Sequence, residues 1–161
     1  MLKIRKAVAG DEDAIWAILE PVIREGETYD FPQETRREDA LSAWLAPVNV
    51  CYVAEEGGDV VGTYVLHPNR KGRGSHVANC GYMTARHAYG RGIGGVMCAH
   101  SLEEAKAAGY LAMQFNFVIA SNHRAVALWT RMGFAVVGRI PEAYLHPNTG
   151  YTDALVMHRH L

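Results

Sequence analysis

The residues best placed to do chemistry in this chain form a glycine-rich turn, which reads Tyr-Gly-Arg-Gly-Ile-Gly-Gly over positions 89–95. Glycines between a strand and a helix let the backbone approach a ligand closely, and the free N–H groups of the helix N-terminus then face that ligand. Such N–H groups, together with the helix dipole, favour phosphate or pyrophosphate, and an arginine in the turn can add a charge-assisted hydrogen bond. The residues expected to bind phosphates are Tyr89, Gly90, Arg91, Gly92, Ile93, Gly94 and Gly95.

A dinucleotide site and a P-loop both disagree with the context of this turn. The glycines at 90, 92 and 95 satisfy GxGxxG, but residues 85–89 separate the turn from its strand, and several elements precede it. The next strand contains Gln114-Phe-Asn-Phe-Val, where a dinucleotide site would need an acidic residue. No lysine followed by serine or threonine comes after the glycines, so a P-loop nucleotidase is excluded. A purely structural turn would need only one glycine.

The elements around the turn predict one mixed α/β (α+β) domain over residues 1–161. Strand patterns cover seven segments, at 2–8, 49–55, 60–66, 76–84, 111–119, 134–140 and 152–160. Helical patterns cover four segments, from the N-cap at Asp11 to Gly26, before Pro47, from 92 to about 108, and from 122 to 132. Residues 57–59 predict a hairpin, and a loop around Pro141 and Pro147 should separate the last two strands. We expect a largely antiparallel sheet with helices packed on it.

Composition excludes several classes of protein. The chain has 16 Lys and Arg against 17 Asp and Glu, a formal net charge of −1, so neither nucleic acid nor an anionic membrane is an expected partner. No apolar run approaches the roughly 18 residues of a membrane span. The three cysteines form no CxxC motif, which favours a reducing cytoplasm. His158 and His160 share a strand face but lack a third ligand, so no metal site is expected.

Two motifs at the right separation resemble the GNAT superfamily of N-acetyltransferases. The acetyl-CoA motif of that family, Arg/Gln-x-x-Gly-x-Gly/Ala, corresponds to the turn, with tyrosine at position 89 in place of Arg or Gln. A second motif corresponds to residues 121–134, and the likeness covers almost the whole chain. Short matches at 26–29, 115–116 and 137–141 indicate enzymes that acetylate small amino acids or imino acids, including phosphinothricin-type acetyltransferases. The resemblance implies acetyl-CoA as cosubstrate and a small-molecule amine as acceptor, and it allows a homodimer.

The resemblance also implies where the ligands bind. Strands 76–84 and 111–119 should splay apart, and the pantetheine arm should enter the gap and pair with Met83 and Thr84 as an added strand would. Asn122 in the second motif should contact the cofactor. Its other role would be to cap the helix that follows. The loop residues that should form walls of the acceptor pocket are Glu27, Tyr29 and Tyr144.

The catalytic groups expected from these two strands are amides. Strand 76–84 contains no carboxylate to act as base, and Trp129 stands where many relatives carry a tyrosine, although indole cannot protonate a thiolate. Asn79 and Asn116 are then the best candidates to orient a water or bind an ammonium or carboxylate group. The structural alternative is that both amides satisfy backbone groups. The functional alternatives are an acetyltransferase for protein N-termini or lysines, and a non-catalytic acyl-CoA sensor.

Overall fold

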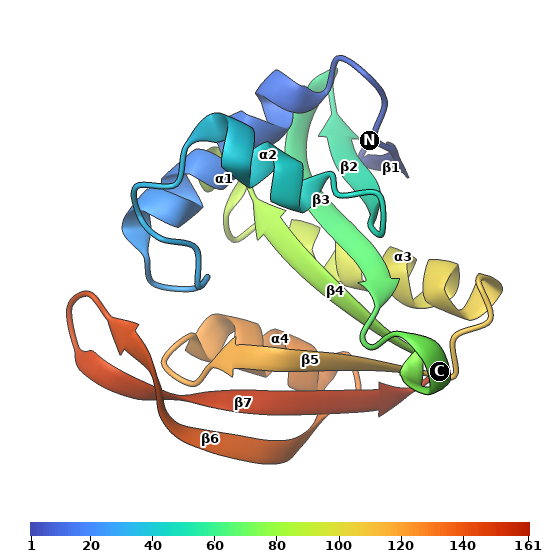
Figure 1. The fold of residues 1–161 in the computed structure, drawn as a ribbon. Coiled ribbons are helices and arrows are strands. Elements are labelled where there is room, and N and C mark those ends of the chain that lie inside the picture. The colour runs from blue at the N-terminus through green and yellow to red at the C-terminus, as the bar shows by residue number, and fades with distance from the viewer.

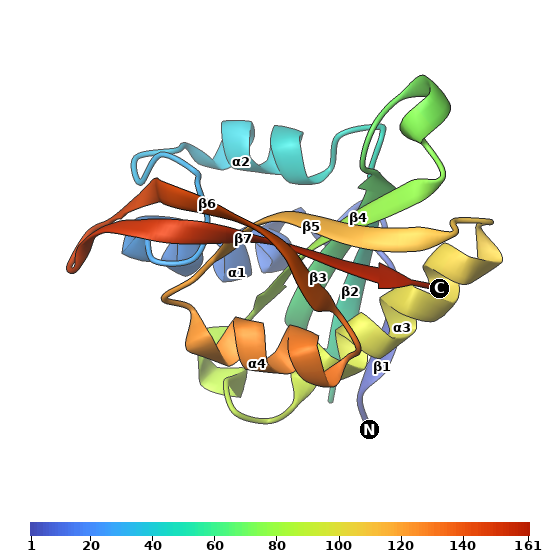
Figure 2. The ribbon, with the colours of Figure 1, turned by 90° about the horizontal axis from the view of Figure 1, so that it is seen from below.

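The computed structural model describes residues 1–161 as a seven-stranded mixed sheet with helices on both faces (Figures 1 and 2). The strands are β1 (Lys3–Lys6), β2 (Val50–Glu56), β3 (Asp59–Pro68), β4 (Val77–Thr84), β5 (Ala112–Ile119), β6 (Ala135–His146) and β7 (Gly150–His160). The helices are α1 (Glu12–Glu25), α2 (Arg37–Trp44), α3 (Ile93–Ala107) and α4 (His123–Arg131), with short 3-10 turns at Gly72–Gly74 and Arg86–Ala88. The predicted fold class and the number of elements are confirmed.

The order of the strands is β1-β2-β3-β4-β5-β7-β6. All neighbours pair antiparallel except β4 and β5, which are parallel because α3 crosses between them. These two strands pair only at Val77 with Ala112 and at Ala78 with Met113. Beyond that point they diverge (Figure 1), as predicted. We call the space between β4 and β5 beyond these pairs the fork.

Helix α1 ends where the sequence predicts but does not begin with the predicted side-chain cap. Gly26 adopts a left-handed φ of 66° and its N–H donates to the carbonyl of Val22. The Asp11 carboxylate makes no bond to a helix N–H; it accepts hydrogen bonds from Arg5 at 2.8 Å and from the N–H of Val8 at 2.8 Å. The ion pair with β1 therefore replaces the expected cap, because Arg5 offers a charged donor within reach.

Hydroxyl groups connect the sheet to α3 through an otherwise apolar core. Tyr52 donates to Glu104 at 2.6 Å, and the hydroxyls of Tyr64 and Tyr82 lie 2.7 Å from His100 and Ser101. Glu104 follows His100 by four positions and Ser101 by three, so both neighbours lie on the same side of α3 as Glu104. These bonds fix α3, and with it the glycine turn at its N-terminus, against β2, β3 and β4.

The last two strands differ from the sequence prediction. Pro141 lies inside β6, where a loop was expected, and the pairing of β6 with β7 is irregular between Ile140 and Tyr144. Because β6 is the edge strand, a proline there removes no ladder hydrogen bond on its outer side, and a bulge accommodates it. Glu142, with a φ of 50°, marks the bulge. None of the helices combines the length and apolar character that crossing a bilayer requires.

Candidate active site

The glycine turn presents a run of free backbone donors at the start of α3. Gly90 and Gly92 have left-handed φ values of 76° and 79°, which L side chains rarely adopt. The N–H groups of residues 90–95 donate to no acceptor within the protein. Gly94 has a packing role as well, because a Cβ on it would lie 3.3 Å from Leu128 of α4. The turn can therefore hold the oxygens of a diphosphate, and the residues present fit such a group.

The side chains of the turn contribute less than its backbone. The Arg91 guanidinium forms an ion pair with Glu56 at the end of β2, so a phosphate would have to compete with a carboxylate for it. Ile93 is buried and offers only its N–H, whereas the Tyr89 side chain is partly exposed. The backbone N–H groups of the turn have no partner in the protein, whereas Arg91 has one, so the backbone is the better candidate to bind an anion.

The register of β3 and β4 decides which backbone groups of β4 face the fork. The N–H of Ala85 donates to Val61, and the ladder alternates from there, so Met83 exchanges its hydrogen bonds with Thr63 of β3. The N–H and C=O groups of Tyr82 and Thr84 consequently point toward β5. The pairing expected of Met83 is therefore corrected to Tyr82, while Thr84 stays a candidate partner of the pantetheine arm.

A loop residue already uses one of these fork-facing groups. The hydroxyl of Tyr29, from the loop between α1 and α2, donates to the carbonyl of Tyr82 at 2.9 Å. Gly81 provides the space, because a Cβ there would lie 3.1 Å from that hydroxyl. Burial raises the pKa of Tyr29, so its hydroxyl remains a donor. Tyr29 thus lies beside the fork, as expected for a wall of the acceptor pocket.

The β6–β7 hairpin fixes this loop from the other side. The Tyr144 hydroxyl donates to the carbonyls of Gly26 and of Tyr29, the latter at 2.9 Å, and Asn148 donates to Glu27 at 2.9 Å. All three predicted wall residues therefore belong to one connected structure. Tyr29 reaches the fork at Tyr82, and the Tyr144 ring lies 6.3 Å from that of Phe117 on β5.

Four amide side chains lie together at the fork, immediately beyond the last paired residues of β4 and β5. Asn79 of β4 and Asn116 of β5 both donate to the side-chain oxygen of Asn69, at 3.2 and 2.7 Å. Gln114 donates to Asn116 at 3.0 Å. We call these four residues the amide cluster. The structure brings the two predicted catalytic asparagines together, through a third that the sequence analysis did not single out because it follows β3 in an ordinary polar loop.

Aromatic side chains form the opposite face of the fork. The Trp129 ring lies 4.9 Å from that of Tyr82 and 5.0 Å from that of Phe115, measured between centroids. The Tyr82 hydroxyl forms a hydrogen bond with the Ser101 hydroxyl. Burial raises the pKa of the Tyr82 hydroxyl well above the ordinary value. A phenol with such a pKa is a weak acid near neutral pH. Neither Trp129 nor Tyr82 is therefore suited to protonate a leaving thiolate.

The thiols are equally unsuited to covalent catalysis. Burial raises the pKa of Cys80 to about 12 and that of Cys98 to about 11, and it also raises the pKa of Cys51. Only a thiolate is a good nucleophile. Near neutral pH the three thiols are therefore protonated, and none is suited to accept an acyl group.

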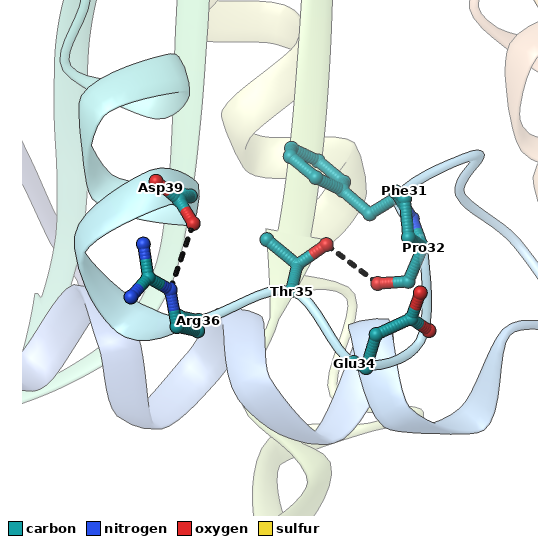
Figure 3. A pocket seen from close by; sticks show the side chains of 6 residues that line it. All are labelled: Phe31, Pro32, Glu34, Thr35, Arg36 and Asp39. Atoms are coloured by element: carbon teal, nitrogen blue, oxygen red, sulfur yellow. Dashed lines mark hydrogen bonds and ion pairs between the residues drawn. The ribbon is translucent and has the colours of Figure 1, made fainter.

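Two cavities lie near the loop between α1 and α2. A cavity of about 280 Å³ lies between that loop and the start of α4, and its lining includes Glu27, Asn122 and Arg124. The Asn122 side chain caps α4 by accepting from the N–H of Ala125 at 3.2 Å, the structural role predicted for it. A larger cavity of about 570 Å³ lies outside α2, where Arg36 is turned toward Asp39 (Figure 3). Because Arg36 and Asp39 neutralise each other, the charge left for a ligand in the larger cavity is the carboxylate of Glu34, which forms no ion pair.

The mixed sheet forks between β4 and β5, and the glycine turn opens α3, the helix that connects these two strands. This arrangement is an acyltransferase-type fold, and comparison with known proteins identifies the family. The chain belongs to the acetyltransferase (GNAT) family, whose model matches residues 15–134. The predicted family is thereby confirmed.

Three individual proteins illustrate the similarity. A GCN5-related N-acetyltransferase from Kribbella flavida is 40% identical, with a TM-score of 0.95 over 99% of this chain and 98% of that one. A phosphinothricin acetyltransferase from Sinorhizobium meliloti, solved with AcCoA, is 20% identical with a TM-score of 0.86 over 99% and 88% of the two chains, which shows the fold alone. N-acetyltransferase aca1 of Schizosaccharomyces pombe is 32% identical over 102 residues, 63% of this chain but 49% of that protein. The match therefore spans about half of that curated relative.

Proposed function

We propose that this protein transfers the acetyl group of acetyl-CoA to the amine of a small amino acid or imino acid, by direct attack in a ternary complex. The observation that carries the proposal is the amide cluster at the fork. It places uncharged hydrogen-bonding groups, and no carboxylate or reactive thiol, beside the backbone groups that would receive the cosubstrate. Membership of the acetyltransferase (GNAT) family and the free N–H groups of residues 90–95 support the choice of acetyl-CoA.

The backbone of this chain would bind and polarise the thioester. The N–H groups of the turn hold the diphosphate, and the fork-facing groups of Thr84 and the N–H of Tyr82 pair with amides of the pantetheine arm. A backbone N–H that faces the fork can also stabilise the oxyanion, a role worth about 3–4 kcal/mol in acyl transfer. The amine nitrogen attacks the carbonyl carbon, the C–S bond breaks, and its electrons leave on sulfur. The thiolate, whose conjugate acid has a pKa of about 8.5, leaves without an assigned acid, and the proton that the nitrogen loses after forming the C–N bond balances the one that the sulfur takes up.

The amide cluster would bind the acceptor. An amino-acid ammonium with a pKa near ~9–10 must lose a proton before attack, and an asparagine cannot take it at neutral pH. Asn79 and Asn116 instead hold the amine, or a water that accepts its proton, in attacking geometry. Substituting either by alanine should lower kcat strongly, because misplacing a reactant by about 1 Å can reduce the rate on the order of a hundredfold.

A thiol-release assay with purified protein and acetyl-CoA tests this proposal. The panel contains L-proline, L-alanine, phosphinothricin, spermidine and a short peptide with a free N-terminus. We expect turnover of at least one amino or imino acid, and rates at least tenfold lower for spermidine and the peptide. A preference for the peptide would instead support acetylation of protein N-termini. Tight acetyl-CoA binding without release with any amine would identify a sensor.

The homodimer that the resemblance allows stays a prediction. The exposed side chains of Val136, Val137 and Ile140 on the edge strand β6 support it, because an unpaired apolar edge favours pairing with a second copy. Light scattering after size exclusion measures the mass directly, and a monomeric mass would refute the homodimer.

A further inference from the structure

Asn69 is the common acceptor of the amide cluster. Its side-chain oxygen receives hydrogen bonds from both Asn79 and Asn116, residues that lie on different strands. Its own backbone is fixed by a hydrogen bond from its N–H to the carbonyl of Val77, 2.8 Å away, at the start of β4. Asn69 and the two hydrogen bonds that its side chain accepts therefore lie at the last part of the sheet in which β3, β4 and β5 are all paired.

The direction of these bonds determines which groups of the cluster remain free. Asn79 uses its NH₂ group on Asn69, and its side-chain oxygen accepts no bond from the protein. Asn116 accepts from Gln114 through its oxygen and donates one N–H to Asn69, so its second N–H and one lone pair of its oxygen are left, as is the second N–H of Asn79. The cluster thus offers a fully unused acceptor on Asn79 and a free N–H donor on Asn116. An amine N–H requires the first, and a carboxylate or carbonyl oxygen requires the second.

We infer that Asn69 is a positioning residue, which acts through Asn79 and Asn116 by fixing the rotation of both amides. Without Asn69, each amide could rotate so that its N and O exchange places. Asn79 would then present N–H donors to an amine whose own N–H groups require an acceptor. This inference rests on the proposed function and extends it, because it assigns amine recognition to Asn79 and oxygen recognition to Asn116. Asn69 itself need not touch the substrate.

The test compares Asn69→Leu, which removes the acceptor at similar volume, with Asn69→Asp, which keeps an acceptor in the same place. Each rate is measured by thiol release with acetyl-CoA and L-proline, or L-alanine if it reacts faster, at the plateau of each variant's own pH profile. We expect kcat to fall at least tenfold in Asn69→Leu and to recover to within about threefold of wild type in Asn69→Asp. The Kd of acetyl-CoA should stay within about twofold.

The matched control is Asn49→Leu. Asn49 also makes two side-chain hydrogen bonds, to the carbonyls of Ala43 and Trp44 at the end of α2, but it is no part of the cluster. Its loss should lower the Tm without changing kcat. If Asn69→Leu does not fold, Asn69→Ser, whose hydroxyl is too short to bridge both amides, provides the same comparison.

Coupling separates positioning from a merely structural role. Added to the Asn79→Ala/Asn116→Ala double variant, Asn69→Leu should lower kcat by less than about twofold, because the groups it orients are gone. A full tenfold loss in that background, or wild-type kcat for Asn69→Leu alone, would overturn the inference while leaving the proposed function intact. Wild-type protein that releases no thiol with any amine would overturn both.

Discussion

Gly92 allows the role of the glycine turn to be tested with a magnitude taken from the structure. Its φ is 79°, and a Cβ built on it meets no atom within 4 Å. A Cβ at this position therefore meets no atom of the free protein, and the main cost of valine is the strain of a side chain at positive φ, about 1–3 kcal/mol. For a chain of this size each kcal/mol lowers the Tm by roughly 2–4 °C. The Gly92→Val protein should remain folded at room temperature.

The effect on ligand binding should be much larger than the effect on folding. A branched side chain would occupy the space through which a diphosphate reaches the N–H groups of residues 90–95. Hydrogen bonds to a charged acceptor contribute about 1.5–3 kcal/mol each, so losing one or two of them should weaken acetyl-CoA binding roughly tenfold to ten-thousandfold. Isothermal titration calorimetry with acetyl-CoA measures this directly.

Gly109→Val is the matched control for strain. Gly109 follows the C-terminal end of α3, has a φ of 88°, and likewise has no atom within 4 Å of a built Cβ. The two variants should lose similar amounts of Tm, yet only Gly92→Val should lose acetyl-CoA affinity. The same Kd for wild type and both variants would show that the turn is only structural and refute the reasoning.

Three further predictions concern binding and stability. Acetyl-CoA at a hundredfold excess over its Kd should stabilise the fold by about 2.7 kcal/mol; a larger thermal shift with NAD than with acetyl-CoA would contradict the assigned ligand. Tyr52→Phe removes the 2.6 Å bond to Glu104 and should lower the free energy of unfolding by about 1–2 kcal/mol in urea titrations, with no change if α3 is held by apolar contacts alone. The hydrogen bonds from Arg5 lower the pKa of Asp11, so its contribution is present above the unfolded pKa of about 3.9 and is lost as the pH falls through the folded value. Wild type should therefore lose more stability than Asp11→Asn as the pH falls from the unfolded pKa through the folded pKa of Asp11, and parallel curves would exclude this role.

Much of the fold and the ligand-binding turn follows from local sequence. The spacing of apolar residues predicts seven strands and four helices, because each element must bury one face. Gly26, Gly90 and Gly92 have the positive φ values that only glycine adopts easily, so their positions can be inferred without tertiary information. Pro141 is the exception, since only its place on the edge strand makes a proline tolerable inside β6.

The details of the site were decided by tertiary structure. The alternation of apolar residues along β4 does not tell which residues turn their backbone groups toward β3 and which toward the fork. The register of β4 with β3 decides this, and it makes Tyr82, not Met83, a candidate partner of the pantetheine arm. Nor can local sequence show that Arg91 pairs with Glu56, because the partner lies 35 positions away. Asn69 stands 47 positions from Asn116 in a polar loop like many others. It joins the site only because β3, β4 and β5 meet at the point where the sheet opens.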